Sequence, residues 1–147
     1  VGKIAVPDAI LFKPGPLSPA EWDVMRLHPA AGHRLLDDPT SPLLSMAATI
    51  ALTHHERWDG TGYPQGLAGG DIPLAGRIVA VADVFDALTT ERPYKAAFSV
   101  ERSVGILQES AGSHLDATLV RLFVGELDAV LRAKARLFDA HQGDGPC

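Results

Sequence analysis

The segment LAGRIVAVADVFDALT, residues 74–89, decides the fold class that the sequence predicts. It is apolar nearly all round, which is typical of a helix at the centre of a helical bundle. Further helices are predicted to begin at Ser18-Pro19, Ser41-Pro42, Ser99 and Asp116, because a capping side chain precedes each apolar-periodic run. Another is expected over residues 29–37. No alternating run is long enough to predict a strand, so we expect an all-α fold.

The chain has 147 residues, a length that favours one domain. We expect that domain to cover residues 1–140, with a disordered tail over 141–147, HQGDGPC. The chain begins with Val1 rather than Met, and we expect it to be part of a longer protein.

Composition excludes several classes of function. The net charge is −5, from 13 Lys and Arg against 18 Asp and Glu, and non-specific binding of a long nucleic acid needs a basic surface. The single cysteine, Cys147, rules out a disulfide framework and favours a reducing, cytoplasmic compartment. No apolar run approaches the roughly 18–20 residues of a membrane span, so no insertion into a membrane is expected.

A long loop separates the predicted helices at the middle of the chain. Residues 56–73, ERWDGTGYPQGLAGGDIP, are rich in glycine and contain two prolines, which disfavour regular structure. Loops of this length inside a compact domain are usually functional. The loop therefore marks the neighbourhood of a candidate site.

Two carboxylates interrupt the central apolar helix. Asp83 and Asp86 lie three residues apart and share a helix face. If they are buried, each needs a cation, a metal or several hydrogen-bond donors. Structural ion pairs with Arg77 or Arg92 satisfy that need, and so does ligation of a metal by at least one of them. Both interpretations stay open on this pattern alone.

Histidines favour the metal interpretation. His54 and His55 stand in tandem at the end of an apolar helix, directly before the glycine-rich loop, and His28 lies at a predicted helix break. With no sulfur ligand available, imidazole and carboxylate remain, a set that suits Fe, Mn or Zn and permits metal activation of water.

Cations follow the acidic pair in TTERPYK, residues 89–95. Arg92 suits bidentate contact with a phosphate and Lys95 suits a point-charge contact, although a solvated loop is the alternative. Candidate metal ligands and candidate phosphate contacts together predict metal-assisted hydrolysis of a phosphoester.

The motifs HHERWDGTGYP (54–64) and DIPLAGRIVAVADVFDALTTERPYK (71–95) closely resemble the HD-GYP family of cyclic-di-GMP phosphodiesterases. The resemblance extends to the opening VGKIAVPDAILFKPGPLSPAEWDVMRLHP and to GSHLD near residues 112–116, and it covers about residues 1–122. It implies an HD-domain-like helical bundle with a long GYP loop and two or three divalent metal ions. Iron or manganese is expected foremost, with zinc, nickel or magnesium as alternatives.

The resemblance also implies a role for each matching residue. The metal ligands are His28, His54, His55 and Asp83; Lys3 assists catalysis at the substrate phosphate; Asp86, Arg92 and Lys95 engage the cyclic dinucleotide; and the loop with Gly62, Tyr63 and Pro64 binds partners, a GGDEF-domain protein among them.

The chain departs from the family pattern in two places. The His-Asp pair of the family would fall immediately before Val1, and the usual GTHFDP reads GSHLDA over residues 112–117. The resemblance implies hydrolysis of cyclic-di-GMP to pGpG, GMP or both. The alternatives are a catalytically incomplete module that binds cyclic-di-GMP or a partner protein, and a phosphohydrolase of the HD superfamily that acts on another nucleotide.

Overall fold

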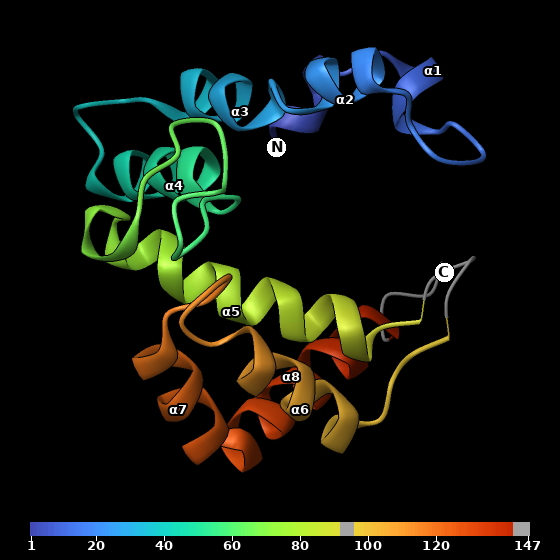
Figure 1. Ribbon diagram of the computed structural model, residues 1–147, viewed down its shortest axis with the longest axis vertical. Coiled ribbons are helices and arrows are strands. Elements are labelled where there is room, and N and C mark those ends of the chain that lie inside the picture. The colour runs from blue at the N-terminus through green and yellow to red at the C-terminus, as the bar shows by residue number, and fades with distance from the viewer. Residues whose placement is uncertain (92–95, 143–147) are drawn as a thin grey trace.

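The chain folds as three tiers of helices (Figure 1). The computed structural model describes residues 1–91 and 96–142, with side chains up to residue 136. In the described residues there is no strand, only two isolated β-bridges, which confirms the predicted all-α class. The elements are η1 (Gly2–Ala5), α1 (Asp8–Leu11), α2 (Pro19–Met25), α3 (His28–Leu36), α4 (Pro42–Thr53), η2 (Gly69–Asp71), α5 (Leu74–Thr89), α6 (Val100–Ser110), α7 (Ala117–Gly125) and α8 (Leu127–Gln142).

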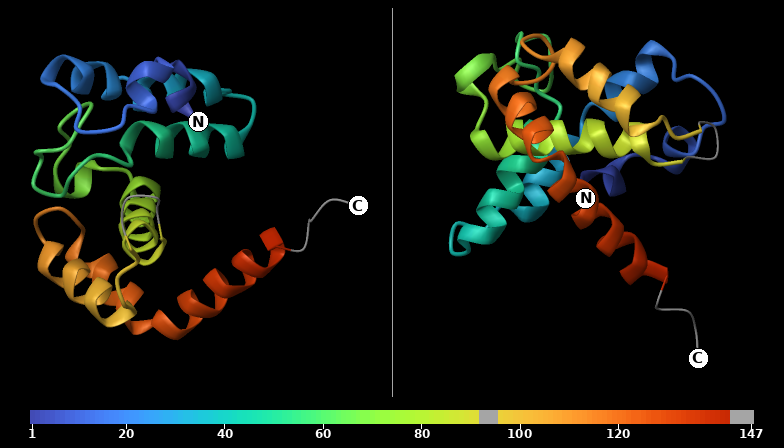
Figure 2. Two further views of the ribbon diagram at one scale, coloured as in Figure 1. Left: turned by 90° about the vertical axis from the view of Figure 1, so that its right-hand side faces the viewer. Right: turned by 90° about the horizontal axis from the view of Figure 1, so that it is seen from below.

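Helix α5 forms the middle tier. The N-terminal elements and α4 lie on one side of it and α6 to α8 lie on the other (Figures 1 and 2). The main core is a cluster of buried side chains between α5 and the C-terminal tier: Ala80, Val81, Phe85, Leu107, Leu115 and Val120. Phe85 meets Phe123 edge to face, with 5.1 Å between the ring centroids, a geometry that aromatic pairs favour.

The predicted helix starts are present with their caps. Ser18 and Glu21 form a reciprocal capping box at the start of α2, and the hydroxyl oxygens of Ser41 and Ser99 accept backbone N–H groups of α4 and α6. Asp116 accepts hydrogen bonds from the first turn of α7 in the same way. These caps satisfy N–H groups that have no partner inside the helix.

Helices α4 and α5 approach closely where the candidate site begins. A Cβ added to Gly76 of α5 would overlap the Oγ1 atom of Thr53, the last residue of α4. Thr53 is only 2 % exposed, and its hydroxyl donates to the Thr49 carbonyl at 2.7 Å. The absence of a side chain at Gly76 therefore lets the end of α4, and the two residues that follow it, lie against α5.

The side chains of Asp83 and Asp86 are both exposed, so neither carboxylate needs a partner to offset burial. The side of α5 that carries Ala80, Val81 and Phe85 is the one that packs into the core. Although its sequence is apolar nearly all round, the helix is therefore covered on part of its circumference only.

The sequence analysis offered Arg77 and Arg92 as ion-pair partners of Asp83 and Asp86. Arg77 pairs with Asp116 at 2.9 Å rather than with Asp83 or Asp86, while Arg92 lies outside the described residues. Asp86 instead accepts a hydrogen bond from Lys134 of α8 at 2.8 Å, a contact between residues 48 positions apart in the chain.

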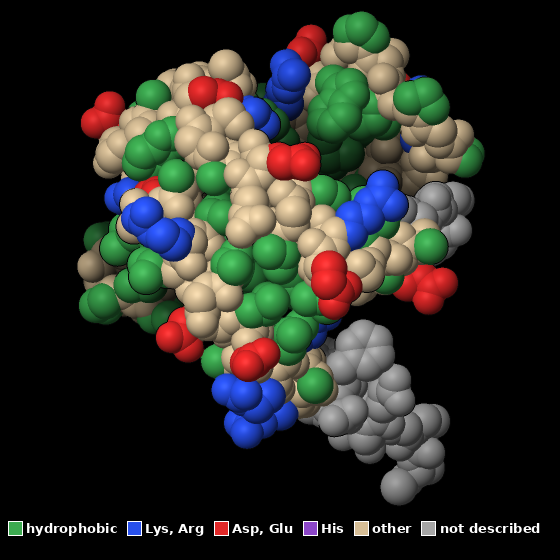
Figure 3. Space-filling view, turned by 60° about the horizontal axis from the view of Figure 1, so that its bottom comes forward, with side chains coloured by type: hydrophobic (Ala, Val, Ile, Leu, Met, Phe, Trp, Pro, Cys, Tyr) green, Lys and Arg blue, Asp and Glu red, His purple; other side chains and the backbone are tan. Residues whose placement is uncertain are grey.

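The surface carries charged side chains of both signs, as the 13 Lys and Arg and 18 Asp and Glu of the sequence lead one to expect. On the face drawn in Figure 3, basic and acidic side chains are interspersed among hydrophobic ones. Among the described residues, no helix is both long enough and apolar enough to cross a membrane.

Helix α8 ends at Gln142, two residues into the segment where a disordered tail is predicted, and residues 143–147 lie outside the described residues.

Candidate metal centre

Three histidines from two neighbouring helix ends form one cluster. His28 is the first residue of α3, His54 caps the C-terminus of α4, and His55 follows it. Each offers one ring nitrogen, and these nitrogens all lie within 4.8 Å of one another. Of the predicted ligands, the structure thus brings together the three histidines.

Hydrogen bonding fixes which nitrogen of His28 is available. Its Nδ1 lies 2.7 Å from the carbonyl oxygen of Met25. A carbonyl can only accept, so Nδ1 carries the proton and Nε2 keeps its lone pair. Nε2 is buried and has no hydrogen-bond partner among the described residues. An unpartnered buried nitrogen of this kind is unfavourable unless something else binds it, and a metal ion supplies that partner.

His54 repeats the arrangement. Its Nδ1 lies 2.9 Å from the carbonyl oxygen of Ala51 and 3.2 Å from that of Ile50. Nδ1 therefore donates to the last turn of α4, and Nε2 is left as the candidate ligand atom. Histidines that ligate metals commonly donate their second ring nitrogen to a backbone carbonyl, which fixes the tautomer and orients the ring.

Burial keeps the imidazoles of His28 and His55 neutral. Burial first, and then the neighbouring His54 and His28, together lower the pKa of His55 to about 3. Burial also lowers the pKa of His28, against the opposing effect of the hydrogen bond to Met25. Only the neutral imidazole has a lone pair for a metal, so His28 and His55 are ready for ligation at neutral pH.

The glycine-rich loop folds back over the cluster. The Tyr63 ring stacks on the His55 ring with 4.9 Å between centroids, and the Tyr63 N–H donates to the His55 carbonyl at 3.2 Å. A Cβ on Gly62 would overlap the backbone nitrogen of Arg57. Gly62 therefore permits the loop backbone to pass directly over the chain that carries His55. The Tyr63–Pro64 peptide bond is cis.

Glu56 anchors this loop, a role that the sequence analysis missed. It is 2 % exposed, and its carboxylate accepts the backbone N–H of Gln65 at 2.8 Å and that of Leu67 at 3.0 Å. The signal was present in the sequence: an acidic residue directly follows the tandem histidines and precedes a loop whose N–H groups have no helix or sheet to pair them. A second attachment joins the loop to the segment before α7, where Trp58 N–H donates to the His114 carbonyl at 3.0 Å.

A cavity of about 420 Å³ opens beside the cluster. Its walls come from η1, α3, α4 and α5, and its lining residues are Val1, Gly2, Lys3, His28, Leu36, Ala47, Ile50, Ala51, His54 and Val79. Lys3 and Val1 therefore lie at the edge of the cavity that His28 and His54 share. The predicted catalytic Lys3 is thus placed next to the candidate metal ligands.

The remaining predicted site residues are not members of the cluster or lie outside the described residues. Asp83 and Asp86 are exposed on α5, and the cluster of three histidines does not include Asp83. Arg92 and Lys95 lie outside the described residues. Their roles as ligand and as substrate contacts stay predictions.

The donor set fits a divalent metal ion. It combines three imidazoles, two of them held by backbone carbonyls, with a buried nitrogen that has no other described partner. Imidazole ligands suit Fe, Zn, Cu and Ni.

Comparison with known families identifies the class of this fold and site. A family model described as the HD domain matches residues 1–119. The chain belongs to the HD-domain family, which confirms the architecture that the motifs predict.

Three curated relatives agree with the resemblance to the HD-GYP phosphodiesterases. The chain is 47 % identical over 137 residues to the cyclic di-GMP phosphodiesterase response regulator RpfG of Xanthomonas campestris, covering 93 % of this chain and 34 % of the relative. It is 45 % identical over 145 residues to a cyclic di-GMP phosphodiesterase of Vibrio cholerae, covering 95 % and 30 %. It is 43 % identical over 146 residues to a cyclic di-GMP phosphodiesterase of Thermotoga maritima, covering 97 % and 40 %. The chain therefore spans about a third of the length of these relatives.

A solved structure shares the fold. The crystal structure of a cyclic GMP-AMP-specific phosphodiesterase of Vibrio cholerae matches with a TM-score of 0.58 at 19 % identity, covering 87 % of this chain and 33 % of that one. The helical arrangement is therefore that of an HD-domain protein.

Proposed function

We propose that this chain is the catalytic domain of a metal-dependent phosphodiesterase that hydrolyses cyclic-di-GMP to pGpG, GMP or both. The observation that carries the proposal is the cluster of His28, His54 and His55 with its unpartnered buried nitrogen. Relatives at 43–47 % identity that are named cyclic di-GMP phosphodiesterases support it.

The three histidines would hold the metal, with Asp83 as a further proposed ligand. Two or three divalent ions are proposed, iron or manganese foremost, with zinc, nickel or magnesium as alternatives. A bound divalent metal lowers the pKa of water and polarises phosphoryl oxygens, which is the chemistry that hydrolysis of a phosphodiester requires.

The protein's own groups would bind and orient the substrate. Lys3, at the edge of the cavity shared with His28 and His54, would neutralise a phosphate oxygen and protonate the departing oxygen. Asp86, Arg92 and Lys95 are proposed to hold the dinucleotide. Tyr63, stacked on His55, would keep that imidazole in one orientation.

The GYP loop is also the proposed docking site for a partner. Pro64 is exposed at the tip of the loop, while Glu56 holds the backbone on either side of Gly66. A preorganised, exposed loop of this kind suits recognition of a protein such as a GGDEF domain. We propose that both act in the cytoplasm.

The test compares His55→Ala with His33→Ala, a control histidine on α3 outside the cluster. Bound metal is quantified by elemental analysis, and the products of cyclic-di-GMP are separated by chromatography. Each variant is assayed in this chain and in the same chain preceded by a His-Asp dipeptide.

We expect His55→Ala to lose bound metal and hydrolysis, and His33→Ala to retain both. Turnover by His55→Ala at the unsubstituted rate would contradict the assignment. If the unsubstituted chain binds cyclic-di-GMP in the presence of metal but does not hydrolyse it, with or without the preceding His-Asp dipeptide, the regulatory binding module would be supported instead.

A further inference from the structure

A second groove is lined by Tyr63 of the GYP loop and by residues of and next to helix α2. It has a volume of about 490 Å³ and is lined by Pro19, Trp22, Asp23, Arg26 and Tyr63. Helix α2 supplies Pro19, Trp22 and Asp23, Arg26 is the C-cap of that helix, and the GYP loop supplies Tyr63. Neither the metal centre nor the residues that the family resemblance assigns to the substrate account for this groove.

Tyr63 connects the groove to the metal centre. Its ring stacks on His55 at an interplanar angle of 26°, and the guanidinium carbon of Arg26 lies 5.7 Å from the centroid of the same ring. A ligand in the groove would therefore touch a residue that itself contacts a candidate metal ligand.

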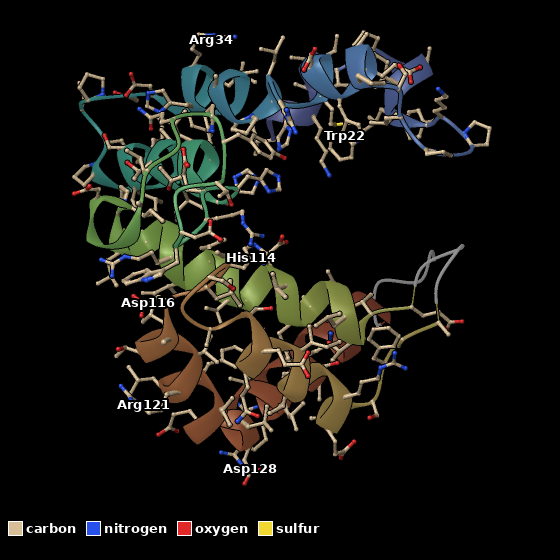
Figure 4. All side chains as sticks on the ribbon, in the orientation of Figure 1. Trp22, Arg34, His114, Asp116, Arg121 and Asp128 are labelled. Carbon is tan, nitrogen blue, oxygen red and sulfur yellow. The ribbon has the colours of Figure 1, made fainter. Side chains whose placement is uncertain are left out.

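The groove presents polar groups that the protein does not use. The Asp23 side chain makes no hydrogen bond or ion pair with another described residue, and the Arg26 side chain makes only its ring contact with Tyr63 in the described part of the chain. Although they lie three positions apart at the end of α2, where Arg26 is the C-cap, their charged groups do not pair. Trp22 is 45 % exposed and lies on the underside of α2 in Figure 4, toward the tier of α5.

An exposed indole, a free carboxylate and a free guanidinium form a set that is complementary to guanine. A carboxylate accepts from the N1–H and the exocyclic amine of guanine at once, while a guanidinium donates to O6 and N7. The indole supplies a face on which the purine stacks. Adenine has an acceptor at N1 and an amine in place of O6, so both charged groups would meet the wrong partner.

We propose that this groove is a guanine-binding subsite in which Trp22 stacks on the base and Asp23 and Arg26 select guanine over adenine. The subsite rests on the proposed function, because a ribose links each base of a cyclic dinucleotide to the phosphates. A base held against Trp22 therefore directs a phosphate toward the neighbouring histidine cluster. Because Trp22 and Asp23 belong to α2 and Asp86 belongs to α5, the two bases would be held by different tiers.

The test measures binding of GMP and AMP by calorimetry, since neither nucleotide contains a phosphodiester to be hydrolysed. The variants are Trp22→Ala and Asp23→Asn. Phe12→Ala and Asp71→Asn serve as matched controls, because both residues are exposed and neither lines the groove. Trp22→Phe keeps an aromatic face and so shows whether any loss of affinity in Trp22→Ala comes from lost stacking. Circular dichroism confirms the fold of each variant.

We expect the unsubstituted chain to prefer GMP to AMP. Asp23→Asn should reduce that preference about tenfold, as loss of a charge-assisted pair of hydrogen bonds implies. Trp22→Ala should weaken the binding of GMP and of AMP about tenfold each, as loss of one stacking contact implies. The preference for GMP over AMP should stay unchanged in this variant. Trp22→Phe and the controls should bind as the unsubstituted chain does.

The same variants are then assayed for hydrolysis of cyclic-di-GMP and cyclic-di-AMP. The subsite is overturned, and the proposed function is left standing, if the variants hydrolyse cyclic-di-GMP but show no change in binding. No change means that Asp23→Asn keeps the preference for GMP and that Trp22→Ala keeps the affinity for both nucleotides. The expected binding changes without hydrolysis of either dinucleotide support the subsite and contradict the proposed function. No measurable preference for GMP in the unsubstituted chain overturns the subsite.

Discussion

The Tyr63 ring lies stacked on the His55 ring, with 4.9 Å between the centroids and 26° between the planes. The loop that carries Tyr63 is thus in direct contact with a candidate metal ligand. Burial raises the pKa of the Tyr63 phenol, so the ring is neutral where it meets the imidazole. The contact gives the GYP loop a physical role in holding the metal centre, in addition to any role at the surface.

Tyr63→Ala should weaken metal binding by about tenfold, the lower end of the range for loss of a group that orients a ligand. Tyr63→Phe keeps the stacked ring and should bind metal as the unsubstituted chain does. Competition with a chromophoric chelator measures both affinities. Equal affinities in Tyr63→Ala and Tyr63→Phe would show that the stacking does not orient His55.

Glu56→Gln should loosen the loop without unfolding the domain. The buried carboxylate accepts two backbone N–H groups, and the amide that replaces it offers one acceptor oxygen, so one N–H loses its partner. We expect a loss of about 1–3 kcal/mol in the free energy of unfolding and faster hydrogen exchange at Gln65 and Leu67.

The matched control for this change is Glu109→Gln, on the exposed surface of α6. It should change the free energy of unfolding by less than about 0.5 kcal/mol. Equal stability losses in the two variants would contradict the anchoring role of Glu56.

Two glycine-to-alanine changes should have opposite signs. At Gly76 the added methyl group would overlap the Thr53 hydroxyl, so Gly76→Ala should destabilise the domain by about 1–3 kcal/mol. At Gly105, inside α6, nothing lies within 4 Å of the added carbon, and Gly105→Ala should stabilise the helix by about 0.5–1 kcal/mol. Chemical denaturation measures both; a stabilising Gly76→Ala would refute the close contact between α4 and α5.

Asp116 should make stability depend on pH at acidic values. Burial alone would raise the pKa of this carboxyl, but hydrogen bonds from Arg77 and from the N–H groups of Thr118 and Leu119 outweigh it and lower the pKa. Since the folded-state pKa lies below the unfolded value of about 3.9, the carboxylate stabilises the fold above that pH. This contribution is lost as the pH falls through the folded-state pKa.

Asp116→Asn should therefore cost about 3 kcal/mol at pH 7, because it also leaves the partly buried Arg77 without its partner. The difference in unfolding free energy between the variant and the unsubstituted chain should shrink as the pH falls below about 4. A difference that stays constant from pH 7 to pH 3 would contradict the account of this ion pair.

Local patterns in the sequence predicted the helices well. The capping residues Ser18, Ser41 and Asp116 mark helix starts because their side chains bond N–H groups two or three residues away. The tandem histidines were recognisable for a similar reason, since a helix end beside a long loop places adjacent side chains at one spot. His28 reaches them across the packed pair of helices α3 and α4.

Features that depend on tertiary arrangement were not predictable from those patterns. The apolar sequence of α5 implied burial all round, but the placement of the tiers leaves Asp83 exposed. The bond from Lys134 to Asp86 joins α8 to α5, and no local spacing indicates it. The contact of Arg26 with Tyr63 likewise depends on how the GYP loop folds back toward α2.

The central claim is that the histidine cluster supports hydrolysis of a cyclic dinucleotide. The most direct measurement is product analysis after incubation of cyclic-di-GMP with the manganese- or iron-supplied chain, unsubstituted and as His54→Ala. The account predicts pGpG or GMP from the unsubstituted chain and neither product from His54→Ala. Equal product formation by the two chains would contradict it.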